Sequence, residues 1–533
     1  MSKIMYVNLT AETVEEREYG DALSQYYGRG LTSYLVKQNV PPHVGRHSAE
    51  NCLILVTGLL SGTFAPSTGR LSIAAKKAQD SGIQYLNLAG PFSQKMACLG
   101  IVAIVITGKN LEAVPAVISF DEGGGQILKV PCLKEREISE TISYIRNNIG
   151  RGKDTAVIGI GSAGEHLLPI ASVFTTYPEG NPLFNCARGG MGDIFGSKGL
   201  KAVAVTTKAN FTSKVVNVTE MERASKRLAR IIIDHPVCGG ALPAYGSITL
   251  MKMMKSNKLN LSSIKETPQS KIIAENQRVN RPKVGSPRIN RTCAPLCVVG
   301  CLNRHARGNE TLLASPAESE VSAALEDFGI EDAAFASRFN RIAFEQGIDS
   351  VEFLFCCALY YKIKDIKAGK DELLAALNEV KELTDMGRIL ASRTEGLYRL
   401  YQDHTELLPM VTRPSIAEEH NFNIKLSFKV AGCEDLEDKQ YLYANMLTLG
   451  NLGICLFTSF AIIESREAMD LLAVLFQAKT GRKLVANDLI RYSADCLKIE
   501  EDYEKQAKLL SLQKEIPEFV KVLHRYFGKG VDK

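Results

Sequence analysis

The sequence contains a glycine-rich stretch that runs into a short apolar segment, Ala187-Arg188-Gly189-Gly190-Met191-Gly192-Asp193-Ile194-Phe195-Gly196-Ser197-Lys198-Gly199-Leu200-Lys201-Ala202-Val203. Glycines at 189, 190 and 192 allow a ligand to approach the backbone closely, because glycine carries no side chain. Phosphates and flat, amide-rich rings bind to exposed backbone N–H groups and to arginine. The stretch therefore predicts either a ligand-binding segment or plain turns beside a solvated arginine.

Around this stretch, the first two hundred residues have the pattern of short strands separated by turns. The predicted strands are rich in Val and Ile and are bounded by Gly, Pro, Asn or Asp: 4–9, 52–58, 71–75, 102–108, 116–120, 127–131, 155–160 and 201–206. After about residue 207 the pattern becomes helical, at 221–233, 317–327, 332–346, 371–383 and 498–512. Strands followed by helices predict an α+β fold rather than alternating βαβ units.

Composition limits the class of protein. A chain of 533 residues with 45% hydrophobic and 23% charged residues is typical of a globular protein of two to four domains. The formal net charge of +5 is small for this length and predicts no nucleic-acid partner. Thirteen cysteines, an odd number, and an N-terminus without a signal pattern predict reduced thiols in a cytoplasmic protein. The apolar runs are too short to cross a bilayer, so no membrane association is expected.

Four cysteines form a separate pattern. Cys293, Cys297 and Cys301 fall within nine residues, and Cys455 lies far downstream. Three clustered thiolates and one remote thiolate can provide the four ligands of a metal site and join two distant segments of the chain. On a helix the three would instead form an apolar stripe, but Pro295 disfavours a regular helix. An iron–sulfur cluster, a zinc site that includes His305, and a site without metal are the alternatives.

A second glycine pattern, Gly159-Ile160-Gly161-Ser162-Ala163-Gly164, matches the G-x-G-x-x-G fingerprint of dinucleotide-binding proteins. Pro169 would interrupt the following helix after one turn, which disfavours a long phosphate-capping helix. A flavin or nicotinamide dehydrogenase is therefore a minor alternative, and a glycine-rich turn between strands is preferred.

Several glycine-containing runs together resemble the tungsten-containing aldehyde:ferredoxin oxidoreductase family. Besides 187–203, the likeness includes Tyr27-Gly28-Arg29-Gly30-Leu31 and residues 51–70, 87–90 and 159–165, and it extends as far as Phe457. The resemblance implies a β-sheet-rich metallopterin-binding domain over 1–208, followed by two mostly α-helical domains. The first, 209–412, would carry three cluster cysteines and one pterin clamp; the second, 413–533, would carry the fourth cysteine and another clamp.

The family's cofactors are a tungsten or molybdenum ion held by two pterin dithiolenes, a magnesium ion between the pterin phosphates, and a [4Fe-4S] cluster. By resemblance, the cluster ligands would be Cys293, Cys297, Cys301 and Cys455, although the family commonly has two residues between the first pair and this chain has three. The pterin would be bound by Arg70, Asn87, Gly90, Ala187, Arg188, Gly189 and Gly190. Asn87 and the backbone around Ala187 would lie near the magnesium ion.

Two segments resemble the family's D-x-x-G-L-(D or C) pterin clamps, Phe344-Glu345-Gln346-Gly347-Ile348-Asp349 and Gly450-Asn451-Leu452-Gly453-Ile454-Cys455. The usual leading Asp is replaced by Phe344 in the first segment and by Gly450 in the second. Glu345 and Asn451 are therefore predicted to bind the pterin instead, together with Asp349 and Ile454. A carboxylate can accept two hydrogen bonds from an aminopyrimidine edge. Asp349 alone could equally cap a helix.

Catalytic candidates follow from the same resemblance. Pro316-Ala317-Glu318-Ser319-Glu320 is similar to the family's Pro-Glu-Tyr-Glu segment, so Glu318 and Glu320 are candidate general bases. Both could instead only favour a helix macrodipole. The family's Arg-Gly-x-x-His core is not recognisable in 408–430, which leaves His420 and His404 as candidates and predicts a divergent, shortened member.

The resemblance implies an oxygen-sensitive, cytoplasmic oxidoreductase of anaerobic metabolism. It would oxidise an aldehyde, or reduce a carboxylic acid, and pass electrons through the cluster to ferredoxin or to a dedicated iron–sulfur partner. A homodimer is expected. The alternative is a non-catalytic metallopterin and iron–sulfur subunit that serves in electron transfer.

Overall fold

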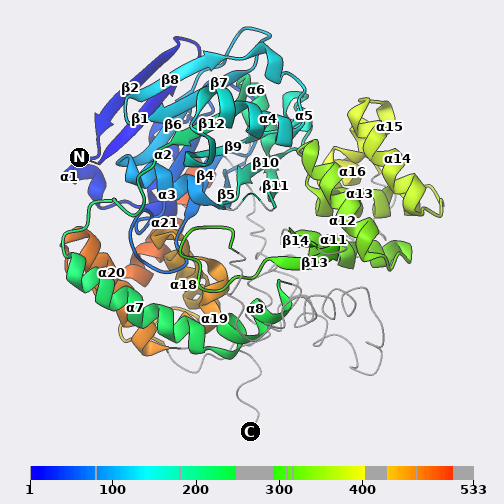
Figure 1. The fold of residues 1–533 in the computed structure, drawn as a ribbon. Coiled ribbons are helices and arrows are strands. Elements are labelled where there is room, and N and C mark those ends of the chain that lie inside the picture. Colours follow the sequence, from blue (N-terminus) through cyan, green and yellow to red (C-terminus); the bar gives the residue numbers. More distant parts are fainter. Residues whose placement is uncertain are drawn as a thin grey trace.

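The computed structural model describes residues 2–78, 81–178, 180, 182–247, 292–307, 310–314, 317–401, 429–463 and 465–507. Two six-stranded sheets form the N-terminal part, and helices form most of the remainder, as the sequence predicts (Figure 1). Within these described ranges, no helix combines the length and the apolar character needed to span a membrane.

The first sheet has the strand order β2-β1-β6-β3-β4-β5. Its strands are β1 (Lys3–Asn8), β2 (Thr13–Glu18), β3 (Leu53–Thr57), β4 (Arg70–Lys76), β5 (Ile83–Ala89) and β6 (Ile101–Thr107). Every residue of β3 is buried, which explains its continuous run of apolar residues. The helices in this part are α1 (Asp21–Ser24), α2 (Gly28–Asn39) and α3 (Pro91–Cys98).

The second sheet has the order β11-β10-β9-β12-β7-β8. Its strands are β7 (Ala116–Asp121), β8 (Gly124–Lys129), β9 (Thr155–Ile160), β10 (Ser172–Thr176), β11 (Phe184–Met191) and β12 (Leu200–Thr206). Short helices connect them: α4 (Ile138–Tyr144), α5 (Ser162–Glu165) and α6 (Gly192–Ser197). The glycine-rich stretch is therefore edge strand β11, followed by a short helix and the central strand β12.

The two sheets share one apolar core, to which both contribute aliphatic side chains such as Leu55, Ile104, Ile158 and Val203. The outer face of the first sheet packs against α2, and the outer face of the second packs against α4. This layered arrangement leaves β5 and β11 in contact with each other. The predicted binding residues Asn87 and Ala187 lie on these two strands.

The helices form two groups with separate cores. One group consists of α11 (Ala317–Ala324), α12 (Ala333–Glu345), α13 (Ser350–Ile363), α14 (Lys370–Lys381), α15 (Asp385–Leu390) and α16 (Arg393–Leu400). The other consists of α7 (Val218–Asp234), α8 (Leu242–Tyr245), α18 (Asp438–Leu452), α19 (Ser459–Ile462), α20 (Arg466–Thr480) and α21 (Ala486–Gln506). A hairpin, β13 (Asn303–Arg307) and β14 (Glu310–Ala314), precedes α11.

The boundaries at residues 208 and 412 stay a prediction. Helix α7, from the predicted middle domain, lies against α20 and shares a core with α18 to α21 (Figure 1). Helices from the predicted middle segment thus contribute to both helical groups.

A backbone interlock joins the first sheet to the end of α18. The N–H groups of Leu59 and Leu60 donate to the carbonyls of Asn451 (3.1 Å) and Leu452 (3.0 Å). Arg70 N–H donates to Gly453 O at 3.2 Å. Gly58 and Gly453 face each other so closely that a Cβ on Gly58 would lie 2.1 Å from Gly453 Cα. Glycine is therefore required at position 58.

We expect Gly58→Ala to lower the free energy of unfolding by about 1–3 kcal/mol, because the added methyl group would force this interlock apart. The matched control is Gly45→Ala, since a Cβ at Gly45 meets nothing within 4 Å; its effect should stay within about 0.5 kcal/mol. Denaturant unfolding of both variants checks this. Equal stability of the two variants would contradict the close packing.

Candidate metal and cofactor site

The four cysteines line one cavity of about 300 Å³. Cys293, Cys297 and Cys301 lie on an irregular segment without helix, so the interpretation as a helical apolar stripe is wrong. Helix α18 ends at Gly453, whose φ is +82°, and Cys455 follows two residues later. The structure thus brings together the local cluster and the remote thiol, as the metal-site hypothesis requires.

Ser67 holds both cysteine segments in place. Its N–H donates to Leu296 O at 2.9 Å, and its carbonyl accepts from Cys455 N–H at 2.9 Å. Its hydroxyl oxygen accepts from Val298 N–H at 3.2 Å. Ser67 and Leu296 both adopt left-handed backbone conformations, with φ of +55° and +57°. One residue of the β3–β4 connection therefore sets the relative position of the two segments.

Arg70 supplies positive charge at the thiols. Its Nη2 donates to Cys455 Sγ at 3.0 Å, and its Nη1 lies 3.4 Å from Asn87 Oδ1. Burial opposes the charged form, but the fields of Cys455 and Cys293 outweigh it and raise the pKa of Arg70. The guanidinium therefore remains charged beside the cavity.

The buried thiols are poor acids without a cation. Burial, with the neighbouring Cys297, raises the pKa of Cys293 to about 12, and Arg70 opposes this only in part. Burial and the other three thiols likewise raise the pKa of Cys301 well above its ordinary value. Thiolate formation therefore needs a positively charged group to compensate, as when cysteines ligate iron.

The four cysteine thiols around this cavity fit the ligand set of the predicted [4Fe-4S] cluster. Among the described residues, no three His, Cys, Asp or Glu side chains come close enough together to hold a single metal ion. Four thiols around a cavity suit the larger [4Fe-4S] group. The side chain of His305, proposed in the zinc alternative, lies outside the described residues.

Ala187 and Arg188 of strand β11 line the same cavity, as do Arg70 and Asn87. Two polar atoms on this wall are buried and have no hydrogen-bond partner among the described residues, Asn185 Oδ1 and Arg188 Nε. An unpaired acceptor and an unpaired donor suit a ligand rich in amide and phosphate groups, such as a pterin. The residues present therefore fit the predicted cofactor.

Gly189 and Gly190 adopt φ values of +105° and +82°, which only glycine adopts readily. The Gly189 N–H donates to Asp349 Oδ2 at 3.1 Å rather than pointing to open space. Asp349 Oδ1 accepts from Glu352 N–H and caps α13, so the helix-cap interpretation of Asp349 is confirmed. Gly90, on the neighbouring loop, packs against Thr175, 2.6 Å from where its Cβ would be.

Asn451 and Ile454 of the second predicted pterin clamp are buried against protein groups. Asn451 is 1% exposed; its Oδ1 accepts from Gly30 N–H at 3.2 Å, and its Nδ2 donates to Ser493 Oγ at 3.1 Å. Ile454 is fully buried beside Thr68. Their predicted role in pterin binding stays a prediction.

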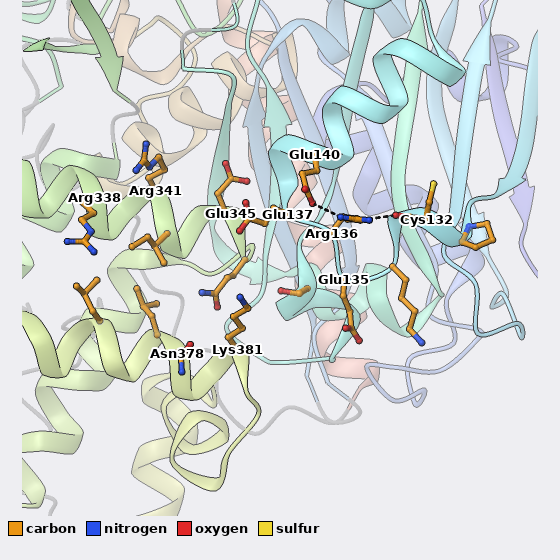
Figure 2. A pocket seen from close by; sticks show the side chains of 17 residues that line it. Cys132, Glu135, Arg136, Glu137, Glu140, Arg338, Arg341, Glu345, Asn378 and Lys381 are labelled. Carbon is orange, nitrogen blue, oxygen red and sulfur yellow. Dashed lines mark hydrogen bonds and ion pairs between the residues drawn. The ribbon is translucent and has the colours of Figure 1, made fainter.

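Glu345 lies in a second cavity, of about 1020 Å³, between residues 131–140 and helices α12 and α14 (Figure 2). Its carboxylate accepts from Ser139 N–H at 2.9 Å, and burial raises its pKa. Figure 2 shows that Arg338, Arg341 and Lys381 approach this cavity from the helical side. Glu345 thus does not line the cysteine cavity.

Of the catalytic candidates, Glu320 lines the cysteine cavity and forms an ion pair with Arg188 Nη1. Glu318 is 4% exposed and lies with Glu320 in the first turn of α11, where both also favour the helix dipole. His420 and His404 lie outside the described residues.

Sequence reasoning missed three residues of this site: Ser67, Tyr177 and Asn185. Tyr177 is 3% exposed, packs against Cys293 and Leu302, and lines the cavity. Ser67 lies within the run 51–70 that carries the resemblance, but no role follows for it from that likeness, and Tyr177 and Asn185 stand outside the quoted runs.

The dinucleotide interpretation of Gly159 to Gly164 is not supported by this geometry. The helix that follows, α5, has four residues. A Cβ on Gly161 would lie 2.4 Å from the carbonyl carbon of Gln346, so the protein's own backbone occupies the space a pyrophosphate would need. These glycines serve close chain packing.

Comparisons with known proteins agree with this architecture. Residues 4–207 match the family model "Aldehyde ferredoxin oxidoreductase, N-terminal domain". The tungsten-containing aldehyde ferredoxin oxidoreductase of Pyrococcus furiosus is 27% identical over 86% of this chain and 82% of its own length. That of Thermococcus kodakarensis is 31% identical over 48% of this chain and 41% of its own length.

Among solved structures, the active site complex BamBC of benzoyl coenzyme A reductase, in complex with 1,5-dienoyl-CoA, has the same fold. Its TM-score is 0.71 at 15% identity, with 99% of this chain and 93% of that chain covered. The fold match shows a shared architecture, a β-sheet-rich N-terminal part with a helical remainder, and the sequence matches are to a family of oxidoreductases. More particularly, the predicted resemblance is confirmed: the N-terminal part matches the model of the aldehyde ferredoxin oxidoreductase N-terminal domain, and most of the chain is similar in sequence to a tungsten-containing aldehyde ferredoxin oxidoreductase.

We expect the rate at which Cys293 is alkylated in the metal-free protein to depend on pH. Because its pKa is about 12, on the order of one thiol in 10⁵ is ionised at pH 7. Its alkylation rate by iodoacetamide should rise about tenfold per pH unit from pH 7 to 10. Peptide mass spectrometry checks this, with exposed Cys132 as reference. Reaction of Cys293 as fast as Cys132 at pH 7 would contradict the burial argument.

Proposed function

We propose that this protein oxidises an aldehyde to a carboxylic acid, or catalyses the reverse reaction, at a tungsten or molybdenum centre held by two pterins. The two electrons released would pass through a [4Fe-4S] cluster to ferredoxin or a dedicated iron–sulfur partner. The observation that carries this proposal is the shared cavity, which four cysteines from two distant segments line together with Ala187 and Arg188 of the glycine-rich strand. The homodimer and the cytoplasmic location stay predictions.

Each group has residues suited to hold it. Cys293, Cys297, Cys301 and Cys455 would ligate the cluster. The wall formed by β11, with Arg188 and Arg70, offers hydrogen bonds and positive charge to pterin phosphates. Asn87 and the backbone near Ala187 offer oxygen atoms to the magnesium ion. When bound, the pterin-held metal supplies the two-electron chemistry that side chains lack.

The chain's own part in the reaction is to move protons and to balance charge. Oxidation of an aldehyde with water yields a carboxylic acid, two protons and two electrons. The Glu320 carboxylate, fixed at the cavity by its ion pair with Arg188, is placed to accept a proton from water or from a hydrated aldehyde. Arg70 would offset the negative charge that thiolate ligands and added electrons bring to the site.

The orientation of Glu320 supports it over Glu318 as the base. Glu320 lines the cavity, whereas Glu318 does not and is buried in the first turn of α11. A general base must lie within hydrogen-bond reach of the proton it takes, directly or through one water. Between the two carboxylates only Glu320 is placed for that contact.

We expect Glu320→Gln to lower kcat for aldehyde oxidation by about 10²-fold or more, because the amide cannot accept the proton. Aldehyde-dependent reduction of a viologen dye under anaerobic conditions measures this. Exposed Glu331, changed to Gln, is the control and should leave kcat unchanged. Unchanged turnover in Glu320→Gln would remove Glu320 from the mechanism.

The same assay also tests the alternative that the protein is a non-catalytic electron-transfer subunit. Wild-type protein that holds iron and tungsten or molybdenum but turns over neither aldehydes nor acids would favour a non-catalytic subunit. Turnover that requires both metals would exclude that alternative.

A further inference from the structure

We infer that Asn185 is an oxygen ligand of the magnesium ion predicted to lie between the pterin phosphates, acting through its side-chain carbonyl. This inference rests on the proposed function, because the ion is expected only where pterin phosphates bind. It adds a side chain that neither the resemblance nor any motif assigns to the site.

The strand places Asn185 on the cavity wall. The preceding residue, Phe184, belongs to the apolar core, where its ring lies 6.4 Å from that of Phe344. Cys186 Sγ is likewise close to Phe344 O, at 3.6 Å. Asn185 lines the cysteine cavity, as do the next three residues of the strand, Cys186, Ala187 and Arg188, so this part of β11 forms a wall of the cavity.

A single hydrogen bond sets the orientation of the amide. Asn185 Nδ2 donates to Cys186 O at 3.0 Å, which assigns the other branch of the side chain to oxygen. That Oδ1 is buried and accepts no hydrogen bond from the part of the chain that the structure describes. Leaving a buried acceptor unpaired is unfavourable, so a ligand that uses this oxygen would remove that penalty.

The neighbouring strand supplies a second amide oxygen. Strand β5 runs beside β11, as the hydrogen bond from Gln84 Nε2 to Gly189 O shows. Asn87, three residues further along β5, lines the same cavity as Asn185. The one donor described for Asn87 Oδ1 is Arg70 Nη1, at a long 3.4 Å.

Two neutral amide oxygens on one wall favour a hard cation. Magnesium binds oxygen ligands and commonly combines a few protein oxygens with phosphate groups and water. Asn87 and Asn185 would supply the protein oxygens, and the phosphates would supply the negative charge that neutral amides lack. The juxtaposition therefore suits an ion shared between protein and phosphate better than a fully protein-bound ion.

The test compares Asn185→Asp with Asn185→Leu. A carboxylate keeps an oxygen ligand for magnesium, whereas leucine removes it. Both substitutions abolish the Nδ2 hydrogen bond to Cys186 O, so a role confined to that bond predicts equal damage. We expect the Asp variant to retain about one magnesium ion per pterin pair and the Leu variant to lose magnesium at least about tenfold.

The measurement is elemental analysis of magnesium, iron and tungsten or molybdenum, with pterin content by fluorescence, on the anaerobically purified full chain. Asn39→Leu is the matched control, since Asn39 Nδ2 also donates to a backbone carbonyl, Leu35 O at 2.7 Å, outside this cavity. It should keep the wild-type magnesium content.

The outcomes separate the inference from the proposed function. Magnesium retained in Asn185→Leu, or lost equally in the Asp and Leu variants, overturns the inference while leaving the proposed function intact. Wild-type protein without pterin overturns the proposed function first, and the inference with it. Magnesium retained in the Asp variant and lost in the Leu variant supports both.

Discussion

The hydrogen bonds between the β3–β4 connection and the end of α18 are the constraint on which the candidate site depends. Arg70 and Cys455 are 385 residues apart in sequence, yet their side chains meet at 3.0 Å. Ser67 bonds the backbone of both cysteine segments, and Gly58 and Gly453 allow the two chains to approach. A core made only of apolar contacts would bring helix and sheet together without fixing four thiols around one cavity.

Charge is the second constraint. Buried thiols repel one another's ionised forms, and one arginine offsets only part of that repulsion. The thiols therefore stay protonated unless a cationic group binds, while on the wall from β11 Asn185 Oδ1 and Arg188 Nε have no hydrogen-bond partner in the part of the chain that the structure describes. A metal cluster would supply the positive charge that the thiolates need. An amide-rich, anionic ligand would supply hydrogen-bond partners for Asn185 and Arg188.

Local patterns in the sequence predicted the order of strands and helices, because runs of Val and Ile and helical periodicity report local burial. The grouping of Cys455 with Cys293 was predicted from the metal-site hypothesis and the resemblance. The direction in which Glu345 and Asn451 point was not predictable, since each bonds a residue distant in sequence, Ser139 and Gly30. The same holds for Ser67 and Asn185, whose roles arise from tertiary contacts and a strand face.

The central claim is that the four cysteines hold an iron–sulfur cluster. The most direct measurement is iron analysis with electron paramagnetic resonance of the anaerobically purified, dithionite-reduced protein and of its Cys455→Ala variant. The account predicts about four iron atoms per chain and the signal of a reduced [4Fe-4S] cluster in the wild type, both lost in the variant. A folded wild-type protein that contains zinc or no metal in place of iron would contradict it.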